Sequence, residues 1–432
     1  MIYHLAQTDP RAPFPDWGTA WPELLQLWPV LLLSLGASLI LTPIMRKLAL
    51  SNGIVDLPDA RRKAHAKPVA YLGGLAIFLG WLVGLCVFVG MRYGSAESET
   101  YAMLLGNNLS AIAFIAMGAT AIVLTGLFDD IYGMRARVKI GGQLFAAAAI
   151  AQTRAVDDVI IRSFAMVGMA PSDMIMQIVG TAMIAILVVG CCNAMNLIDG
   201  LDGLASGVTA IAMAGMLAIC VLVLARYHHN EYVVSHLGIP ILMTLATIGA
   251  VAGFLPYNFN PASIFMGDTG SLLLGYLCVV TILFMGRLDN DGGLSPMVFT
   301  GAVICFALPV TDTLLAIVRR KLNRRPIFAP DSMHMHHMFR RCGLSVKKSV
   351  VSMYTLGVLF AAMGFSLLAF SLRWSMVLIA FGVVLLIILV VGYLVSRRLE
   401  ASEAVHPRPA EGPETSGLAK TPPAPKQQAQ AG

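Results

Sequence analysis

Long apolar stretches, separated by short polar connections, recur along almost the whole chain of 432 residues. A helix needs about 20 apolar residues to cross a bilayer, so each stretch of that size predicts a membrane-spanning helix. The pattern predicts an all-α fold, a polytopic transmembrane bundle of about 11 helices, although the Ala-rich fourth stretch is short. The eleven stretches lie at 24–48, 71–91, 108–128, 138–152, 174–195, 204–225, 238–257, 264–286, 295–319, 349–371 and 374–396.

The composition agrees with this pattern, because 57% of the residues are hydrophobic and only 12% are charged. Soluble domains average about 25% charged residues and leave much of their surface in water. Soluble, disordered, collagen-like and disulfide-stabilised proteins are therefore excluded. The seven cysteines mostly lie inside the apolar stretches without the spacing of disulfides or metal ligands, so we expect them to be reduced.

Lys and Arg residues gather in alternate connections, and such residues prefer the cytoplasmic side of a membrane. With the N-terminus outside, 23 of them face the cytoplasm and 7 face outward. We therefore expect an external N-terminal segment at 1–23, a transmembrane domain at 24–398 and a disordered cytoplasmic tail at 399–432. The net charge of +6 then reflects topology, and no water-exposed domain is large enough to bind nucleic acid.

The rare acids collect at the ends of the predicted helices. Asp129 and Asp130 end the third, Asp199 and Asp202 end the fifth, and Asp268 begins the eighth, all at the cytoplasmic face in this orientation. Each alone could simply cap a helix. Together they predict an all-oxygen site suited to Mg²⁺, which is typically held by one or two carboxylates and by substrate phosphates.

The basic loop 319–348 carries three histidines, His334, His336 and His337. If this part is helical, Asp331 is placed as its N-cap. Three interpretations compete: zinc ligands, an incidental polar surface, or donors to phosphate. We favour phosphate binding, because protonated imidazoles and the neighbouring arginines both donate to phosphate oxygens.

Five motifs resemble those of the polyprenyl-phosphate N-acetylhexosaminyl 1-phosphate transferases, and among these the bacterial undecaprenyl-phosphate N-acetylglucosaminyl 1-phosphate transferases. They lie at 56–74, 126–143, 193–207, 254–271 and 309–339, in the order of the family. The resemblance implies a bundle of ten or eleven transmembrane helices in the bacterial cytoplasmic (inner) membrane. Its active site would face the cytoplasm.

The resemblance also implies a metal site. Asp129 and Asp130 match an acidic pair implicated in metal binding and in engaging the acceptor phosphate. Asp268 matches the aspartate that binds Mg²⁺, and Asn196 is a candidate second contact to the metal. Mn²⁺ is the alternative cofactor.

The same comparison implies contacts to the nucleotide sugar. Asp199 and Asp202 match residues that touch the donor, with Asn193 beside them. Phe265 matches the aromatic residue on which uracil stacks, and Asn258 its hydrogen-bonding neighbour.

Phosphate-binding groups complete the implied site. One departure is Ser332, which stands where the family has an Arg; Arg324 or Arg325 would have to compensate for the missing cation. The implied phosphate-binding residues are Lys139, His334, His336 and His337, with Lys63 and Lys67 as further candidates.

The reaction implied is the transfer of N-acetylglucosamine 1-phosphate from UDP-N-acetylglucosamine to undecaprenyl phosphate. It releases UMP and starts a cell-surface polysaccharide. Another UDP-N-acetylhexosamine, including UDP-N-acetylmuramoyl-pentapeptide, is the alternative donor, and a homodimer is kept open as the assembly. A proton-coupled solute transporter is a remote alternative, because it predicts acids at mid-membrane, and only Asp312, which lies deeper than the other acids on the same side, hints at that.

Overall fold

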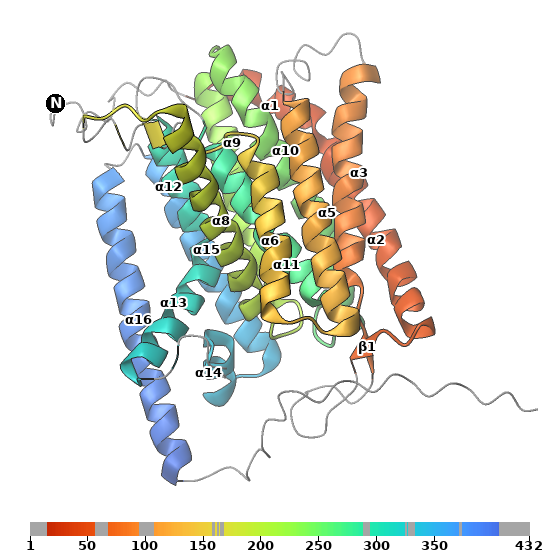
Figure 1. Cartoon of the computed structure of the whole chain (residues 1–432), viewed down its shortest axis with the longest axis vertical. Helices are drawn as coiled ribbons and strands as arrows, with labels where there is room; N and C mark the ends of the chain where they lie inside the picture. Colours follow the sequence, from red (N-terminus) through yellow and green to blue (C-terminus); the bar gives the residue numbers. More distant parts are fainter. Residues whose placement is uncertain are drawn as a thin grey trace, which may run out of the picture.

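The chain folds into a bundle of long helices (Figure 1). This computed structural model describes residues 15–56, 68–94, 108–157, 160–161, 164, 168–287, 294–324, 326, 333–370 and 374–405. The helices are α1 (Trp17–Gln26), α2 (Trp28–Ser51), α3 (Gly73–Gly94), α5 (Leu109–Tyr132), α6 (Ala136–Ala151), α8 (Asp173–Ile198), α9 (Leu204–Tyr227), α10 (Glu231–Asn258), α11 (Gly267–Met285), α12 (Leu294–Cys305), α13 (Ala307–Leu322), α14 (Met335–Arg341), α15 (Val346–Ala369) and α16 (Trp374–Val405). Two short strands, β1 (Val55–Asp56) and β2 (Val69–Ala70), pair antiparallel.

The bundle is that of a multi-pass membrane protein. Within the described ranges, nine helices are long and apolar enough to cross a membrane, and ten if α12 and α13, bent by 65° at their junction, form one span. These agree with ten of the eleven predicted stretches. The eleventh, 138–152, forms α6, whose 16 residues extend about 24 Å against a hydrocarbon core of about 30 Å.

The limits of the predicted domains differ slightly from those of the helices. α16 continues to Val405, past the expected boundary at 398. α1 begins within the segment expected before the first span and ends three residues beyond it, at Gln26. The remainder of the predicted tail, 406–432, lies outside the described residues. The orientation of the bundle in the membrane stays a prediction.

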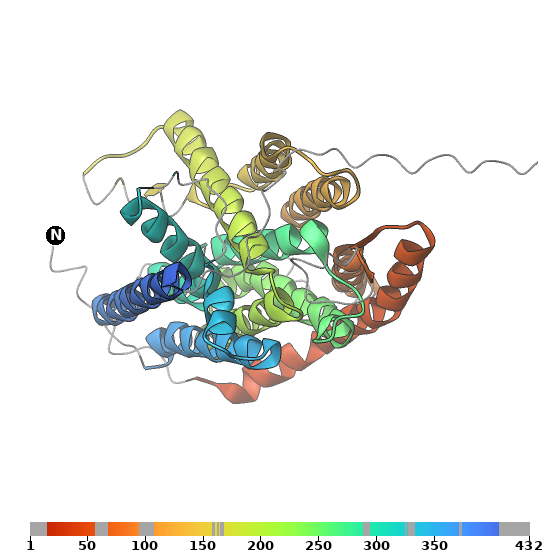
Figure 2. The same ribbon diagram turned by 90° about the horizontal axis from the view of Figure 1, so that it is seen from below.

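The centre of the bundle is formed by α10 and α11, as the view from below shows (Figure 2). In the apolar window of α11, 94% of the residues are buried, whereas in that of α16 none is. α11 packs against α3, α5, α8, α9 and α10, so that its N-terminus is held by several neighbours at once. In contrast, α16 contacts α13, α14 and α15 at the edge.

Glycines bring backbones into contact where α11 begins. A Cβ on Gly74 of α3 would lie 2.1 Å from the Gly270 nitrogen, and one on Gly126 of α5 would lie 2.4 Å from the Thr269 Cα. Only glycine permits such close approach. The first turn of α11 is thereby fixed between the start of α3 and the end of α5, and this turn carries Asp268.

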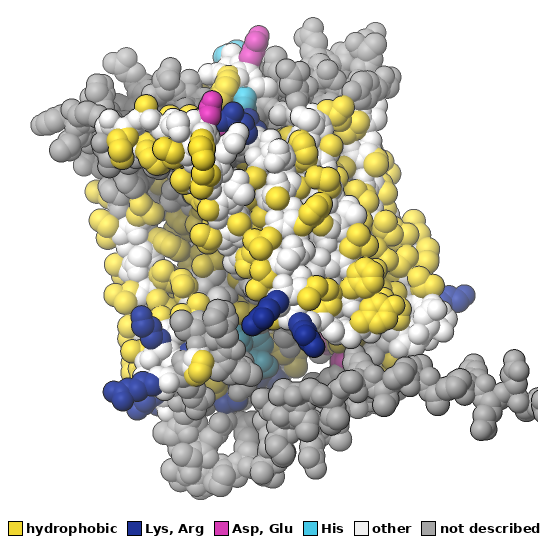
Figure 3. Space-filling model, in the orientation of Figure 1, with side chains coloured by type: hydrophobic (Ala, Val, Ile, Leu, Met, Phe, Trp, Pro, Cys, Tyr) yellow, Lys and Arg dark blue, Asp and Glu magenta, His cyan; other side chains and the backbone are white. Residues whose placement is uncertain are grey.

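The two ends of the bundle differ in surface chemistry. Figure 3 shows hydrophobic side chains over the middle of the molecule and most of the visible Lys and Arg side chains at its lower end, while His is visible at both ends. The ends of α5 and α8 and the starts of α6, α9 and α11 meet at that lower end (Figure 1).

Candidate active site

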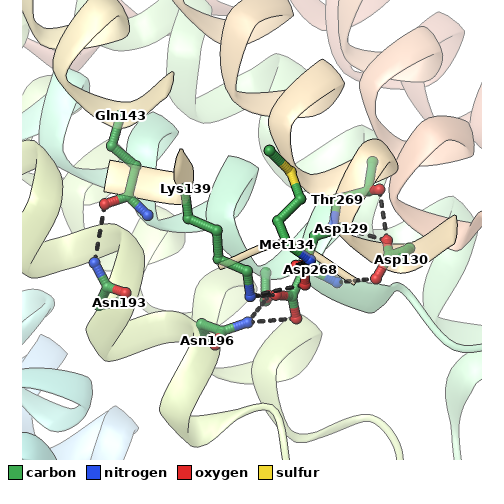
Figure 4. A network of polar contacts seen from close by, with 10 residues as sticks. Asp129, Asp130, Met134, Lys139, Gln143, Asn193, Asn196, Asp268 and Thr269 are labelled. Atoms are coloured by element: carbon green, nitrogen blue, oxygen red, sulfur yellow. Dashed lines mark hydrogen bonds and ion pairs between the residues drawn. The ribbon is translucent and has the colours of Figure 1, made fainter. Parts of the chain in front are cut away.

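Lys139 is the centre of a polar network at the lower end of the bundle (Figure 4). Its ammonium, on the first turn of α6, lies 2.7 Å from Asp129 Oδ2 at the end of α5 and also pairs with Asp268 Oδ2 at the start of α11. Asn196 Nδ2 on α8 donates to Asp268 Oδ1 at 2.8 Å and to Ser271 Oγ at 2.9 Å. Four helices therefore each contribute a polar side chain to one place, as the sequence predicted for the acids.

The adjacent acids Asp129 and Asp130 have different contacts. Asp130 Oδ1 accepts a hydrogen bond from the Asp268 backbone N–H at 2.8 Å, and Oδ2 accepts from the backbone N–H and hydroxyl of Thr269 at 3.0 and 2.6 Å. It thus caps the N-terminus of α11, where the helix dipole favours an anion. Asp129 Oδ1 instead accepts from the Met134 N–H at 2.6 Å, which leaves Oδ2 for Lys139.

Two further carboxylates belong to the same region. Asp199 follows the last residue of α8, and burial raises its pKa to about 8, with the charges of Asp268, Asp130 and Asp202 adding to the effect. Asp202 accepts hydrogen bonds from Asn260 Nδ2 at 2.8 Å and from the Ala262 N–H at 3.0 Å. The acids therefore converge at one place as predicted, and their mutual repulsion favours the protonated form of Asp199.

The two asparagines assigned to the donor are both bonded within the protein. Asn193 Nδ2 donates to Gln143 Oε1 at 3.0 Å, one turn deeper in the bundle than the contact of Asn196 (Figure 4). Asn258 is 3% exposed; its Oδ1 accepts from the Gly203 N–H at 3.2 Å, and its Nδ2 donates to Ile264 O at 3.1 Å. Asn258 therefore joins the loop after α8 to the segment before α11, and its contact with uracil stays a prediction.

Phe265 lies beside an aromatic residue that the sequence analysis did not single out. Its backbone N–H donates to Ala70 O at 2.8 Å, and its ring centroid lies 6.1 Å from that of Tyr71. Burial raises the pKa of Tyr71 well above its usual value, and the nearby charges of Asp56, Asp130 and Asp268 contribute. Tyr71 lies within the motif at 56–74, but nothing in the sequence distinguishes its ring from those in the spans.

The three histidines lie side by side but have different surroundings. His334 Nδ1 lies 2.8 Å from Asp312 Oδ2 in the bent span, and the Met335 N–H donates to Asp312 Oδ1 at 2.7 Å. His336 is 1% exposed, and burial lowers its pKa to about 3, so its imidazole is neutral. Phosphate binding by His336 stays a prediction. His337 is partly exposed.

Five of the residues singled out from the sequence are outside the part of the chain that the structure describes. Lys63, Lys67, Asp331, Arg325 and Ser332 lie outside the described residues. The residue that precedes α14 as its N-cap is His334, and the carboxylate that binds the first N–H group of this helix is that of Asp312. Within the described ranges, no three or more His, Cys, Asp or Glu side chains form a group that could hold a metal, which gives no support to a zinc site.

The donor set nevertheless fits Mg²⁺, which typically takes one or two carboxylates and completes its shell with water and phosphate. Asp129 and Asp268 are 15% and 24% exposed and already share one cation, the Lys139 ammonium. The space between them therefore accepts positive charge. Asn196 turns its amide N–H toward Asp268 and orients that carboxylate, while its own contact with a metal stays a prediction.

Sequence comparisons identify relatives of the chain. A family model described as glycosyl transferase family 4 matches residues 112–286. A Bacillus subtilis protein, named as a probable undecaprenyl-phosphate N-acetylglucosaminyl 1-phosphate transferase, is 36% identical over 76% of this chain and 82% of its own length. The decaprenyl-phosphate N-acetylglucosaminephosphotransferase of Mycobacterium tuberculosis is 33% identical over 72% of this chain and 74% of its own. The chain belongs to the polyprenyl-phosphate N-acetylhexosamine 1-phosphate transferase family.

As a member of this transferase family, the protein is an enzyme that transfers a sugar phosphate to a polyprenyl phosphate. The family also includes relatives with another donor. A phospho-N-acetylmuramoyl-pentapeptide-transferase of Bacillus cytotoxicus is 28% identical over 77% of this chain and 94% of its own length. The matched range 112–286 contains Asp129, Lys139, Asp199 and Asp268, so the polar network lies in the part that defines the family.

Proposed function

We propose that this transferase moves N-acetylglucosamine 1-phosphate from UDP-N-acetylglucosamine to undecaprenyl phosphate at the cytoplasmic face of a bacterial inner membrane. The observation that carries the proposal is the Asp129–Lys139–Asp268 network, formed where four helices end or begin. The two relatives named for N-acetylglucosamine transfer are 36% and 33% identical, against 28% for the muramoyl-pentapeptide transferase. This difference supports the choice of sugar.

The main barrier in this reaction is electrostatic. A phosphate monoester has a second pKa of about 6, so the lipid phosphate is largely ionised and needs little help from a base. It must approach the β-phosphorus of a dianionic diphosphate while UMP leaves. Charge neutralisation and in-line positioning are then the main sources of rate enhancement.

Several side chains fit these tasks. Asp268, with Asp129, would hold Mg²⁺, which when bound neutralises charge on the diphosphate. Lys139 supplies a fixed positive charge between the same carboxylates. Asp130 positions Asp268 by capping α11. Phe265 and Tyr71 offer aromatic surface next to the acids for the uracil ring.

The location of the network supports the proposed membrane side. It lies at the end of the bundle where Lys and Arg side chains gather (Figure 3), and such residues favour the cytoplasm. A site at this interface lets a lipid confined to the bilayer meet a soluble nucleotide sugar without either crossing the membrane.

The test is an assay of UMP release by membranes supplied with undecaprenyl phosphate, Mg²⁺ and a panel of UDP-sugars. We expect UDP-N-acetylglucosamine to be the preferred donor, and Asp268→Asn to lower UMP release by about 10³-fold or more. Asp173→Asn is the matched control, because Asp173 is exposed at the start of α8, at the other end of the bundle.

Two results would contradict the proposal. If the enzyme preferred UDP-N-acetylmuramoyl-pentapeptide, the proposed donor sugar would be wrong, although the class of reaction would be unchanged. Full activity of Asp268→Asn, with normal expression, would remove the proposed metal site.

A further inference from the structure

Asp312 is a buried carboxylate that the proposed chemistry does not use. It lies in α13, shortly after the 65° bend that separates this helix from α12, and it is 1% exposed. A buried carboxylate is costly unless its charge and its lone pairs are compensated. Its contacts therefore need an explanation.

Both carboxylate oxygens of Asp312 are used to hold the beginning of α14. Oδ2 lies 2.8 Å from His334 Nδ1, and Oδ1 accepts a hydrogen bond from the Met335 N–H at 2.7 Å. His334, like Asp312, is buried, at 4% exposure. A carboxylate bound in this way selects the His334 tautomer with the proton on Nδ1 and fixes its ring.

The neighbouring His336 is held differently. Its ring lies parallel to that of His334, with centroids 6.0 Å apart and an interplanar angle of 8°. Neither of its ring nitrogens has a hydrogen-bond partner among the described residues, although the side chain is 1% exposed. A Cβ on Gly200, in the loop between Asp199 and Asp202, would lie 2.3 Å from His336 Nε2.

These contacts indicate different roles for His334 and His336. We propose that Asp312 and His334 are positioning residues, which lock the first turn of α14 so that His336 is presented at Gly200 as a hydrogen-bond donor to the diphosphate of the donor sugar. His334 is thereby a support for the site rather than a phosphate ligand. The inference rests on the proposed transfer reaction, which it deepens.

The same contacts give Asp312 a structural role. Both of its oxygens are bound to the start of one short helix. The acid that the sequence left as a hint of a transporter thus has an explanation within the transferase fold.

The experiment uses the full-length protein in detergent with undecaprenyl phosphate. Asp312→Asn should lower kcat/KM for UDP-N-acetylglucosamine by about 10- to 100-fold and leave KM for the lipid within about twofold. His334→Asn keeps a donor close to the position of Nδ1, so it should retain most of the activity, while His334→Ala should lose it to the same extent as Asp312→Asn. Thr311→Val, at a buried neighbour whose hydroxyl bonds only its own helix, is the control.

A double-mutant cycle separates positioning from general loss of structure. If Asp312 acts through His334, the double variant Asp312→Asn with His334→Ala should be no less active than His334→Ala alone. Hydrogen exchange should also be faster at the α14 amides in Asp312→Asn and unchanged in Thr311→Val. A double variant whose losses simply multiply, or an α14 that exchanges at the wild-type rate, would overturn the proposal.

These outcomes are distinct from failure of the proposed function. If wild-type protein released no UMP with any UDP-sugar, the transfer reaction would be refuted directly. If wild-type protein were active and Asp268→Asn inactive, but Asp312→Asn and His334→Ala kept full activity, only the positioning role would be refuted.

Discussion

Two cations, one at each end of the same helix, each bridge two carboxylates. Lys139 in the first turn of α6 pairs with Asp129 and Asp268, and its side chain is 23% exposed. Arg154, three residues after α6 ends, pairs with Asp157 at 2.5 Å and with Asp173 at 3.5 Å, and its side chain is 49% exposed. The two arrangements look alike as ion pairs but differ in their surroundings.

The difference lies in what surrounds each group of charges. Arg154 forms its ion pairs with Asp157 and Asp173, and the side chain of Asp173 is 82% exposed, so water screens the interaction. Around Lys139, the carboxylate of Asp130 lies beside Asp268, and the acids of this region raise the pKa of the neighbouring Asp199 carboxyl. Like charges are held together at a cost in stability, and such clusters are characteristic of sites that receive an opposite charge from a ligand.

Of the changes that test this comparison, removing the cation at the site has the largest expected effect. Lys139→Met should lower UMP release by about 10²-fold or more, because a charge that stabilises the phosphates is lost. The same variant should bind Mn²⁺ more tightly than wild type in the absence of substrate, by about tenfold, because its carboxylates no longer share a cation. Electron paramagnetic resonance of free Mn²⁺ measures the second effect without turnover.

The matched control for this change is Lys47→Met. Lys47 is exposed on α2, and the substitution removes the same charge. Both readouts should stay at the wild-type level. If Lys139→Met bound Mn²⁺ no more tightly than Lys47→Met, the space between Asp129 and Asp268 would not be the metal site.

The helices and the convergence of the acids could be predicted from the sequence, because apolar length determines the spans and the acids terminate them. The separate roles of Asp129 and Asp130 could not. Asp130 caps a helix that begins 137 positions further along the chain at Gly267, and this contact depends on how closely α5 approaches α11. The missing information is three-dimensional packing rather than residue type.

The histidine motif shows the same limit. The spacing of His334, His336 and His337 gave a cluster of equivalent donors, but the structure gives one a carboxylate partner and another none. The partner, Asp312, is 22 positions away and lies in α13, shortly after the bend in the ninth span. No local pattern around residue 334 contains that bend.

An intermediate effect is expected in the pH dependence of stability. Desolvation by the surrounding protein, together with the charges of nearby acids, raises the pKa of the Asp199 carboxyl in the folded protein from an ordinary value of 3.8 to about 8. Between these values the folded state keeps a proton that the unfolded state has lost, so stability falls as the pH rises from about 4 to about 8. Asp199→Asn should therefore reduce the fall in thermal midpoint between pH 6 and pH 8, measured in detergent without divalent cations.

Added Mg²⁺ provides the internal control for that measurement. A divalent cation near Asp199 favours its ionised form, so saturating Mg²⁺ should reduce the pH dependence of the wild-type protein toward that of Asp199→Asn. If the thermal midpoint fell equally with pH in the wild type and in Asp199→Asn without Mg²⁺, Asp199 would not keep a proton in the folded state.

The smallest effect is expected at Arg154, the cation near the other end of α6. Arg154→Gln removes a cation that bridges Asp157 and Asp173, as Lys139→Met removes one that bridges Asp129 and Asp268. Because the Arg154 pairs are exposed and far from the network, UMP release should stay within about twofold and the thermal midpoint within about 2 °C of wild type. A loss of UMP release comparable to that of Lys139→Met would mean that α6 transmits changes from one end of the bundle to the other, and the contrast between the two cations would then reflect the helix and not the local charge.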